Sequence, residues 1–99
     1  MAPLLSKEQL ESFLRDNPEW RLQDGALARR FRFGTYMEGL QFAEAVAVEA
    51  ESRDHHPDIL LAYKEVTLFL TSNDVGGVTE RDLESARAAD GIASSRGAR

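Results

Sequence analysis

The chain has 99 residues, enough for one compact domain but too few for a barrel enzyme or a dinucleotide-binding fold. It has no cysteine, which excludes disulfides, thiolate metal ligands and a cysteine nucleophile. The 17 acidic and 12 basic residues give a net charge of −5, which argues against direct binding to nucleic acid or to an anionic membrane surface.

The start of the chain predicts neither a secretory signal nor a membrane span. Met1–Glu8 lacks a charged start and a long apolar run, and no stretch approaches the roughly 18–20 apolar residues of a transmembrane helix. A cytoplasmic location is therefore expected. The chain is expected to form a single domain over 1–99, with frayed ends at 1–4 and 92–99.

A first helix is predicted to begin after Ser6. Ser6-Lys7-Glu8-Gln9 has the pattern of a capping box, in which Ser6 is the N-cap and Gln9 the third helical residue. Leu10, Phe13 and Leu14 supply its apolar stripe. Asn17-Pro18 should end the helix.

The stretch from Trp20 to Phe33 is predicted to form a β-hairpin. Asp24-Gly25 is a turn signal, and Leu27, Arg29, Phe31 and Phe33 alternate at the period of a strand. The intervening arginines, Arg30 and Arg32, are then expected on a solvated face.

A longer helix is predicted from the N-cap Thr35 to about Ala50. Phe42 broadens its expected buried stripe, which consists of Leu40, Ala43, Val46, Ala47 and Ala50.

Two strands are predicted next, over 58–63 and 66–71. The short link between them makes them antiparallel neighbours. Ile59–Tyr63 is apolar at both odd and even positions, which indicates burial on both faces or burial in a subunit contact.

The chain closes with a loop at 74–77 and a helix capped by Thr79. Leu83, Ala86 and Ala89 form its expected inner face, and Gly91 should end it. The element order α-β-β-α-β-β-α predicts an α+β fold in two layers. A four-stranded antiparallel sheet should carry three helices on one face.

Both histidines of the chain stand side by side as His55-His56, between a predicted helix and a predicted strand. Glu51 and Asp54 precede them closely, and a carboxylate beside an imidazole can raise its pKa and fix its tautomer. Such a group can act as a general acid near neutral pH. The alternative is a solvated pair without catalytic function. No metal site is expected, because adjacent histidines project in different directions and no third ligand has a familiar spacing.

The sequence resembles the pterin-4a-carbinolamine dehydratases over roughly Leu5 to Asp90. The resemblance rests mainly on two segments, Glu51-Ser52-Arg53-Asp54-His55-His56-Pro57-Asp58 and Gly77-Val78-Thr79-Glu80-Arg81-Asp82. The strand end Leu70-Thr71-Ser72-Asn73-Asp74, together with Trp20, Phe31-Arg32-Phe33 and Phe42, adds to it.

This resemblance implies loss of water from 4a-hydroxytetrahydropterin to give quinonoid dihydropterin, with neither metal nor organic cofactor. It implies a pterin substrate and a homodimer or homotetramer in which sheets join. His55 and His56 match two of the family's three catalytic histidines. Six further residues match positions that line the pterin or stand near it, namely Glu51, Asp54, Pro57, Ser72, Asp74 and Val75. Asp82 matches another acidic position, with an expected role in orienting an imidazole or the pterin.

Asn73 departs from the family pattern, which has the third histidine at this position. An asparagine amide can hold a hydroxyl by hydrogen bonds but cannot exchange a proton near neutral pH. Two functions therefore remain open. The chain is either a dehydratase that relies on His55, or a non-catalytic member of the same fold. Such relatives serve as a Rubisco assembly chaperone or as the dimerisation cofactor of a transcription factor.

Overall fold

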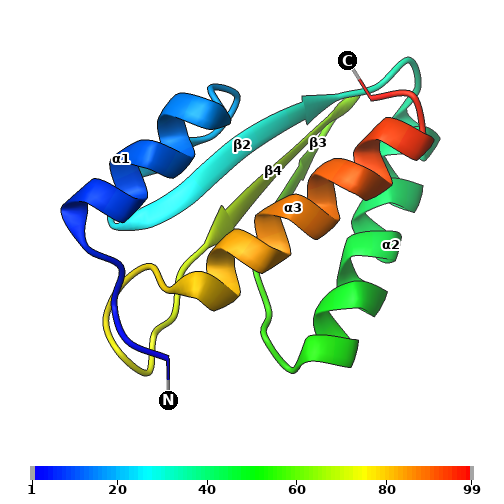
Figure 1. The fold of residues 1–99 in the computed structure, drawn as a ribbon. Coiled ribbons are helices and arrows are strands. Elements are labelled where there is room, and N and C mark those ends of the chain that lie inside the picture. The colour runs from blue at the N-terminus through cyan, green and yellow to red at the C-terminus, as the bar shows by residue number, and fades with distance from the viewer. Residues whose placement is uncertain (1, 99) are drawn as a thin grey trace.

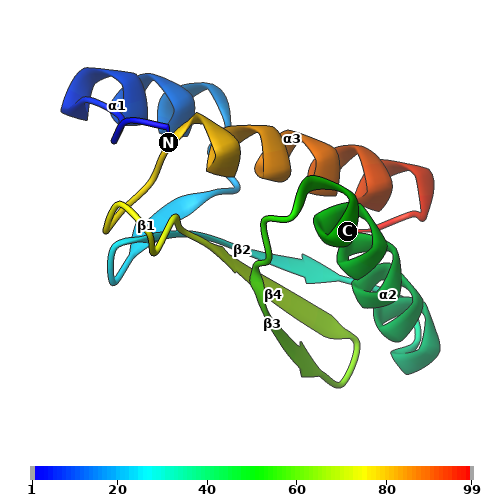
Figure 2. The ribbon, with the colours of Figure 1, turned by 90° about the horizontal axis from the view of Figure 1, so that it is seen from below.

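The computed structural model describes residues 2–98 and shows one sheet with helices on one side. In chain order the elements are α1 (Lys7–Asp16), β1 (Arg21–Gln23), β2 (Ala26–Arg32), α2 (Tyr36–Arg53), β3 (Asp58–Ala62), β4 (Glu65–Leu70) and α3 (Glu80–Ser95). Figures 1 and 2 show α1, α2 and α3 on the same face of the sheet. The predicted α+β class and element order are confirmed.

The sheet is antiparallel throughout and has the strand order β1-β2-β4-β3. β2 and β4 form its centre, and β3 is an edge strand. Side chains alternate between the faces, so that Leu27 and Phe31 of β2 and Leu68 of β4 point toward the helices. Aromatic rings fill the middle of this core, with the Phe31 and Phe42 centroids 4.8 Å apart.

The helix starts follow from local capping. In α1, the Ser6 hydroxyl accepts from the Gln9 backbone N–H, and the Gln9 side chain accepts from the Ser6 N–H. In α3, Thr79 and Asp82 make the same reciprocal pair. Each box satisfies two backbone donors that a helix leaves unpaired.

The buried face of α2 differs from the prediction. Its buried residues are Gly39, Phe42, Val46 and Ala50, whereas Leu40 is 39% exposed and Ala47 is also exposed. Apolar residues surround much of this helix, so periodicity alone allows more than one stripe. The large ring of Phe42 packs on Phe31 and Phe33 and thereby sets the face that the helix presents to the sheet.

Two further predictions need correction. α3 continues through Gly91, the residue predicted to end it, and Ala93 is buried, so 92–95 belong to the helix. Burial of β3 on both faces within the subunit is wrong, because Ile59 and Leu61 are half-buried while Leu60 is exposed.

The N-terminal segment is tied to the loop before α3. Leu4 forms a β-bridge with Thr79, although residues 1–4 were expected to fray, and the Leu5 N–H donates to the Val78 carbonyl at 3.0 Å. A Cβ on Gly77 would lie 2.9 Å from the Leu4 side chain, so this close approach favours glycine.

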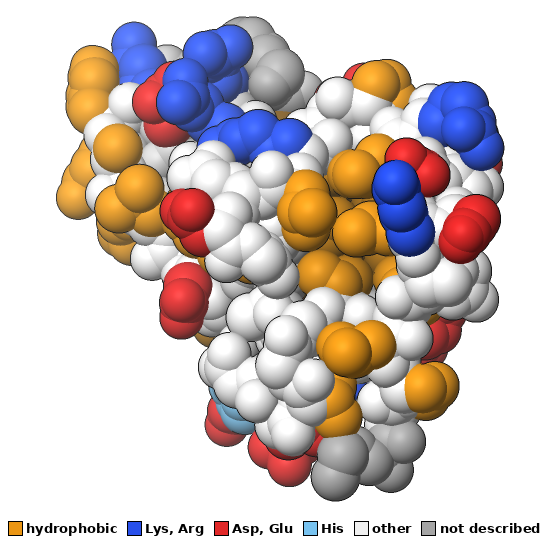
Figure 3. All heavy atoms as spheres, turned by 90° about the vertical axis from the view of Figure 1, so that its left-hand side faces the viewer, with side chains coloured by type: hydrophobic (Ala, Val, Ile, Leu, Met, Phe, Trp, Pro, Cys, Tyr) orange, Lys and Arg blue, Asp and Glu red, His pale blue; other side chains and the backbone are white. Residues whose placement is uncertain are grey.

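Several large apolar side chains remain on the surface. Figure 3 shows apolar groups gathered on the face that includes α1. The exposed large apolar residues are Leu4, Leu22, Tyr36, Met37, Leu40, Val48, Leu60 and Tyr63. None of the helices within 2–98 has both the length and the apolarity that a membrane crossing requires.

A polar cluster of Trp20, Arg29 and Asp90 joins β2 to α3. Asp90 accepts from Trp20 Nε1 at 3.0 Å and pairs with Arg29 at 2.8 Å, and the Arg29 guanidinium lies over the Phe31 ring. Burial raises the pKa of the Asp90 carboxyl, and its hydrogen bond from Trp20 and the charge of Arg29 oppose that shift.

We expect Asp90→Ala to lower the free energy of unfolding by about 1–3 kcal/mol, because two buried donors lose their acceptor. Asp90→Asn keeps one acceptor oxygen and should cost less.

The raised pKa means that the folded state holds the Asp90 proton to higher pH than the unfolded chain does. The stability of the wild type relative to Asp90→Asn should therefore fall as the pH rises through that raised pKa. Urea denaturation of the three proteins across acidic pH checks this, and equal stability of Asp90→Ala and wild type would contradict it.

Candidate functional site

The predicted site residues come from two places that the fold brings together: the turn between α2 and β3, and the segment from the end of β4 to the start of α3. Asp54 ends α2 in the left-handed conformation, with φ 51°, which turns the chain sharply. The His55 N–H then donates to the Ala50 carbonyl at 3.2 Å, which holds His55 against the end of α2. The side chain of His55 consequently points toward the start of α3.

Asp82 is the centre of the site and is fully buried, with 0% exposed. One of its oxygens accepts from the Thr79 N–H at 2.9 Å and from the Ser72 hydroxyl at 2.8 Å. Its other oxygen lies 2.6 Å from His55 Nε2. The carboxylate thus caps α3 and orients an imidazole at the same time.

Ser72 completes this buried network. Its hydroxyl lies 2.9 Å from the Thr79 hydroxyl, and its backbone N–H donates to the Gly77 carbonyl at 2.8 Å. Its own carbonyl accepts from Val75, Gly76 and Gly77, which closes the tight turn after β4. Ser72 and Val75, two predicted site residues, therefore shape the loop that supports Asp82.

The hydrogen bonds assign the roles of the two nitrogens of His55. An ionised Asp82 can only accept, so His55 Nε2 carries a hydrogen and donates it. His55 Nδ1 is then the nitrogen left for a substrate or solvent.

His55 borders an outer hollow of about 210 Å³, which was not predicted from the sequence. Its other lining residues are Arg53, Arg81 and Glu84. Arg81 belongs to the Gly77–Asp82 segment that carries the family resemblance, but it was not among the predicted site residues. Its position directly before Asp82 could have indicated that it lies near the site. Contacts that depend on the fold bring Arg53 and Glu84 to the hollow, and their spacing gave no signal for them.

Asp74 lies close to this hollow and fixes Arg81. Its carboxylate accepts from Arg81 at 2.7 Å. This hydrogen bond holds the pKa of Asp74 below its usual value, and the charge of His55 acts weakly in the same direction. Asp74 therefore stays ionised at neutral pH.

His56 lies in different surroundings from His55. Its Nε2 is hydrogen-bonded to the Glu51 carboxylate, but the His56 and Glu51 side chains are 52% and 77% exposed, against 13% for His55. The two adjacent histidines thus have different environments, one nearly buried on a buried acid and one in solvent.

The remaining predicted residues are less closely connected. Pro57 lines an inner cavity beside His55, and Asp54 is exposed and acts as the cap of α2. Asn73 is exposed on the turn next to Ser72. The structure brings His55, Ser72 and Asp82 into direct contact.

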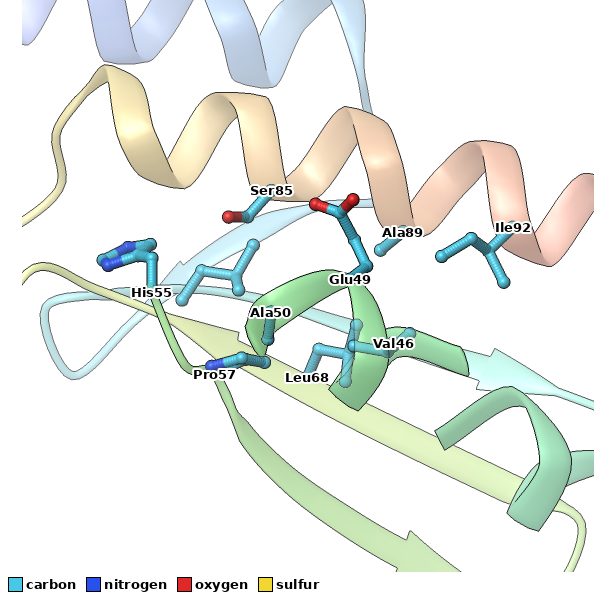
Figure 4. Close-up of a pocket in the computed structure, with 10 residues that line it drawn as sticks. Val46, Glu49, Ala50, His55, Pro57, Leu68, Ser85, Ala89 and Ile92 are labelled. Atoms are coloured by element: carbon cyan, nitrogen blue, oxygen red, sulfur yellow. The ribbon is translucent and has the colours of Figure 1, made fainter. Parts of the chain in front are cut away.

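The inner cavity lies between α2, α3 and the sheet (Figure 4) and offers about 10 Å³ of free space. His55 stands at one end of it. Most of its lining is apolar, and the full set is Val46, Glu49, Ala50, His55, Pro57, Leu68, Leu70, Ser85, Ala89 and Ile92. In the described part of the chain, no three histidine or acidic side chains gather in an arrangement that could hold a metal ion.

Comparison with known proteins gives a consistent family. Residues 3–92 match the family model described as pterin 4 alpha carbinolamine dehydratase. The chain is 39% identical over 89 residues to a Mycolicibacterium vanbaalenii protein named as a candidate pterin-4-alpha-carbinolamine dehydratase, covering 90% of this chain and 96% of that one. A Picosynechococcus protein with the same name is 38% identical over 86 residues, or 87% of this chain and 94% of that one.

Two solved structures are similar. A transcriptional coactivator/pterin dehydratase from Brucella melitensis has a TM-score of 0.86 at 32% identity, covering 92% of this chain and 99% of that one. A pterin dehydratase-like protein, described as a RuBisCO assembly factor in the alpha-carboxysome, has a TM-score of 0.65 at 29% identity. That match covers 76% of this chain and 89% of the other.

Proposed function

The chain belongs to the pterin 4 alpha carbinolamine dehydratase family, and on that premise we propose that it removes water from 4a-hydroxytetrahydropterin to give quinonoid dihydropterin. The observation that carries this proposal is the contact between His55 Nε2 and the buried Asp82. The buried carboxylate fixes the orientation of the His55 ring, which a histidine free in solvent would lack. The pair is the arrangement expected of an oriented general acid.

In the proposed reaction, the protonated His55 gives the proton on Nδ1 to the departing 4a-hydroxyl as the carbon–oxygen bond breaks. A ring nitrogen of the pterin loses a proton, and His56 with Glu51 accepts it. The net products are water and the quinonoid dihydropterin, so protons balance over the cycle. Such acid–base steps typically contribute about 10²–10⁴-fold each.

We assign the other predicted residues to supporting roles. Asp82 positions His55 and does not touch the pterin, because its oxygens are already engaged by protein groups. Asp54 and Pro57 hold the turn that carries the histidines. Asp74 fixes Arg81 at the outer hollow, where the pterin would bind.

Asn73 takes the place of the family's third histidine in this proposal, and its amide holds the departing hydroxyl by hydrogen bonds. We expect Asn73→His to raise kcat by about tenfold or more, because the new imidazole can exchange a proton. The measurement is the rate of 4a-hydroxytetrahydropterin dehydration by the purified variant and the wild type. Asn73→Ala is the matched control and should fall below the wild type. Equal rates for all three proteins would show that position 73 does not take part.

Asn73 also favours a second function, in which the chain binds a protein partner. Asn73 removes a proton-exchanging group, and a structural neighbour is described as a RuBisCO assembly factor. Under this alternative the chain binds a protein partner and does not accelerate dehydration. Purified protein that increases the yield of assembled Rubisco while leaving the pterin unchanged would support it. Absence of any effect on Rubisco would exclude it.

We further propose that the protein is cytoplasmic and forms a homodimer or homotetramer. The exposed apolar residues on the edge strand and on α2 support self-association, since contiguous apolar surface is usually covered. The same contact would cover Leu60 of β3, which is exposed in one subunit. Light scattering of the purified chain gives the mass, and a monomer at all concentrations would contradict the proposal.

A further inference from the structure

Ser85 has a buried hydroxyl that the site described above does not use. It lies on α3, one turn after Asp82, and its Oγ is inaccessible to solvent and has no hydrogen-bond partner within the described chain. A buried hydroxyl without a partner typically costs about 1–3 kcal/mol. Such a group therefore indicates a partner other than the protein itself.

The hydroxyl lies at the inner cavity between α2 and α3. Figure 4 shows the Ser85 hydroxyl and the Glu49 carboxylate in the layer between the two helices, with the Ser85 hydroxyl directed to the side where His55 stands. The free space of about 10 Å³ is close to the room that one water molecule requires. A buried water also needs two to four polar neighbours, and Ser85 and Glu49 provide two.

We infer that this cavity is the binding site of one internal water molecule, hydrogen-bonded between Ser85 and Glu49, with His55 at one end of the same cavity. The apolar remainder of the lining, including Val46 and Ile92, limits the site to a single molecule. The Glu49 side chain is 29% exposed and also pairs with Arg53 on the next turn of α2. The water then satisfies Ser85 without a break in the packing of the helices.

The site places a polar molecule on the inner side of His55, opposite the outer hollow. The charged groups around this ring are Asp82 behind it, Arg53 and Glu49 on α2, Arg81 and Glu84 on α3, and Asp74 on the loop. The hydration site stands independently of the proposed activity.

The test uses the full chain and two variants of the same shape, Ser85→Val and Ser85→Thr. Valine fills the space without a hydroxyl, whereas threonine keeps it. We expect crystal structures to show the ordered water lost in Ser85→Val and retained in Ser85→Thr. Retention of the same water in well-folded Ser85→Val would contradict the role given to the hydroxyl.

A high-resolution crystal structure of the wild type provides the second readout and does not depend on any variant folding. One ordered water bonded to Ser85 Oγ is expected, and a dry cavity would overturn the inference. Neither readout involves the pterin, so an inactive protein would reject the proposed function without affecting this inference.

Discussion

Replacement of Asp82 by alanine is expected to destabilise the fold and to abolish activity together. The substitution leaves the Ser72 hydroxyl, the Thr79 N–H and His55 Nε2 without their common acceptor. Loss of one member of a buried hydrogen-bonded charge pair typically costs about 3–5 kcal/mol, and the helix cap is lost as well. Urea denaturation followed by circular dichroism measures the first effect, and the dehydration assay measures the second.

Asp82→Asn separates orientation from stability. The amide has nearly the same shape and can still accept from Thr79 through its oxygen. With its oxygen on the Thr79 N–H and the Ser72 hydroxyl, its NH₂ group faces His55 Nε2, which would then have to accept, so the tautomer of the imidazole is disturbed. We therefore expect a smaller loss of stability than for alanine, with activity still reduced by about 10²-fold or more.

Glu80→Ala is the matched control for both variants. Glu80 is an exposed acid in the same first turn of α3 and pairs with Arg87 at the surface. Exposed pairs contribute about 0–1 kcal/mol, so this variant should keep both its stability and its activity. If Asp82→Ala were as stable and as active as Glu80→Ala, the central position assigned to Asp82 would be wrong.

The second large effect is expected at His55, and it should exceed the effect at His56. His55→Gln removes the proposed acid while an amide retains part of the contact with Asp82, so the fold should persist. We expect kcat to fall by about 10²–10⁴-fold, the range of a general acid. His56→Gln removes the proposed proton acceptor, but this ring is half-exposed and water can accept the proton in its place, so the effect should be at least tenfold smaller.

The comparison of the two histidine variants is internally controlled, because the residues are adjacent and the substitutions identical. Circular dichroism and thermal melting should first confirm that both variants fold. Equal losses of activity would contradict the different roles given to the two rings. A fully active His55→Gln would remove His55 from the mechanism.

The parts of the fold that depend on neighbouring residues could be predicted from the sequence. The capping box at Ser6-Gln9 and the N-cap at Thr79 depend on residues close in the sequence, and the hairpin around Asp24-Gly25 has a short local signal. Predictions that depended on distant contacts were less accurate. The face of α2 is set by the packing of Phe42 on β2, which periodicity could not distinguish from a stripe through Leu40.

The same difference between local and distant contacts decides which parts of the candidate site could be predicted. Adjacent carboxylates and histidines pointed to residues 51–56, and the family resemblance added Pro57, the 72–75 segment and Asp82. The burial of Asp82, and hence its place behind His55, depends on how α3 docks on α2 and could not be read from spacing. Arg81 and Ser85 were missed because a lone charge or hydroxyl on a helix becomes informative only when its surroundings are known.

The most direct test is the rate at which purified wild-type protein dehydrates 4a-hydroxytetrahydropterin, followed by absorbance as the quinonoid dihydropterin forms. The proposed role of the His55–Asp82 pair predicts a rate clearly above the uncatalysed reaction, with this acceleration lost in His55→Gln. A wild-type rate equal to the uncatalysed rate, together with no pterin binding, would contradict it.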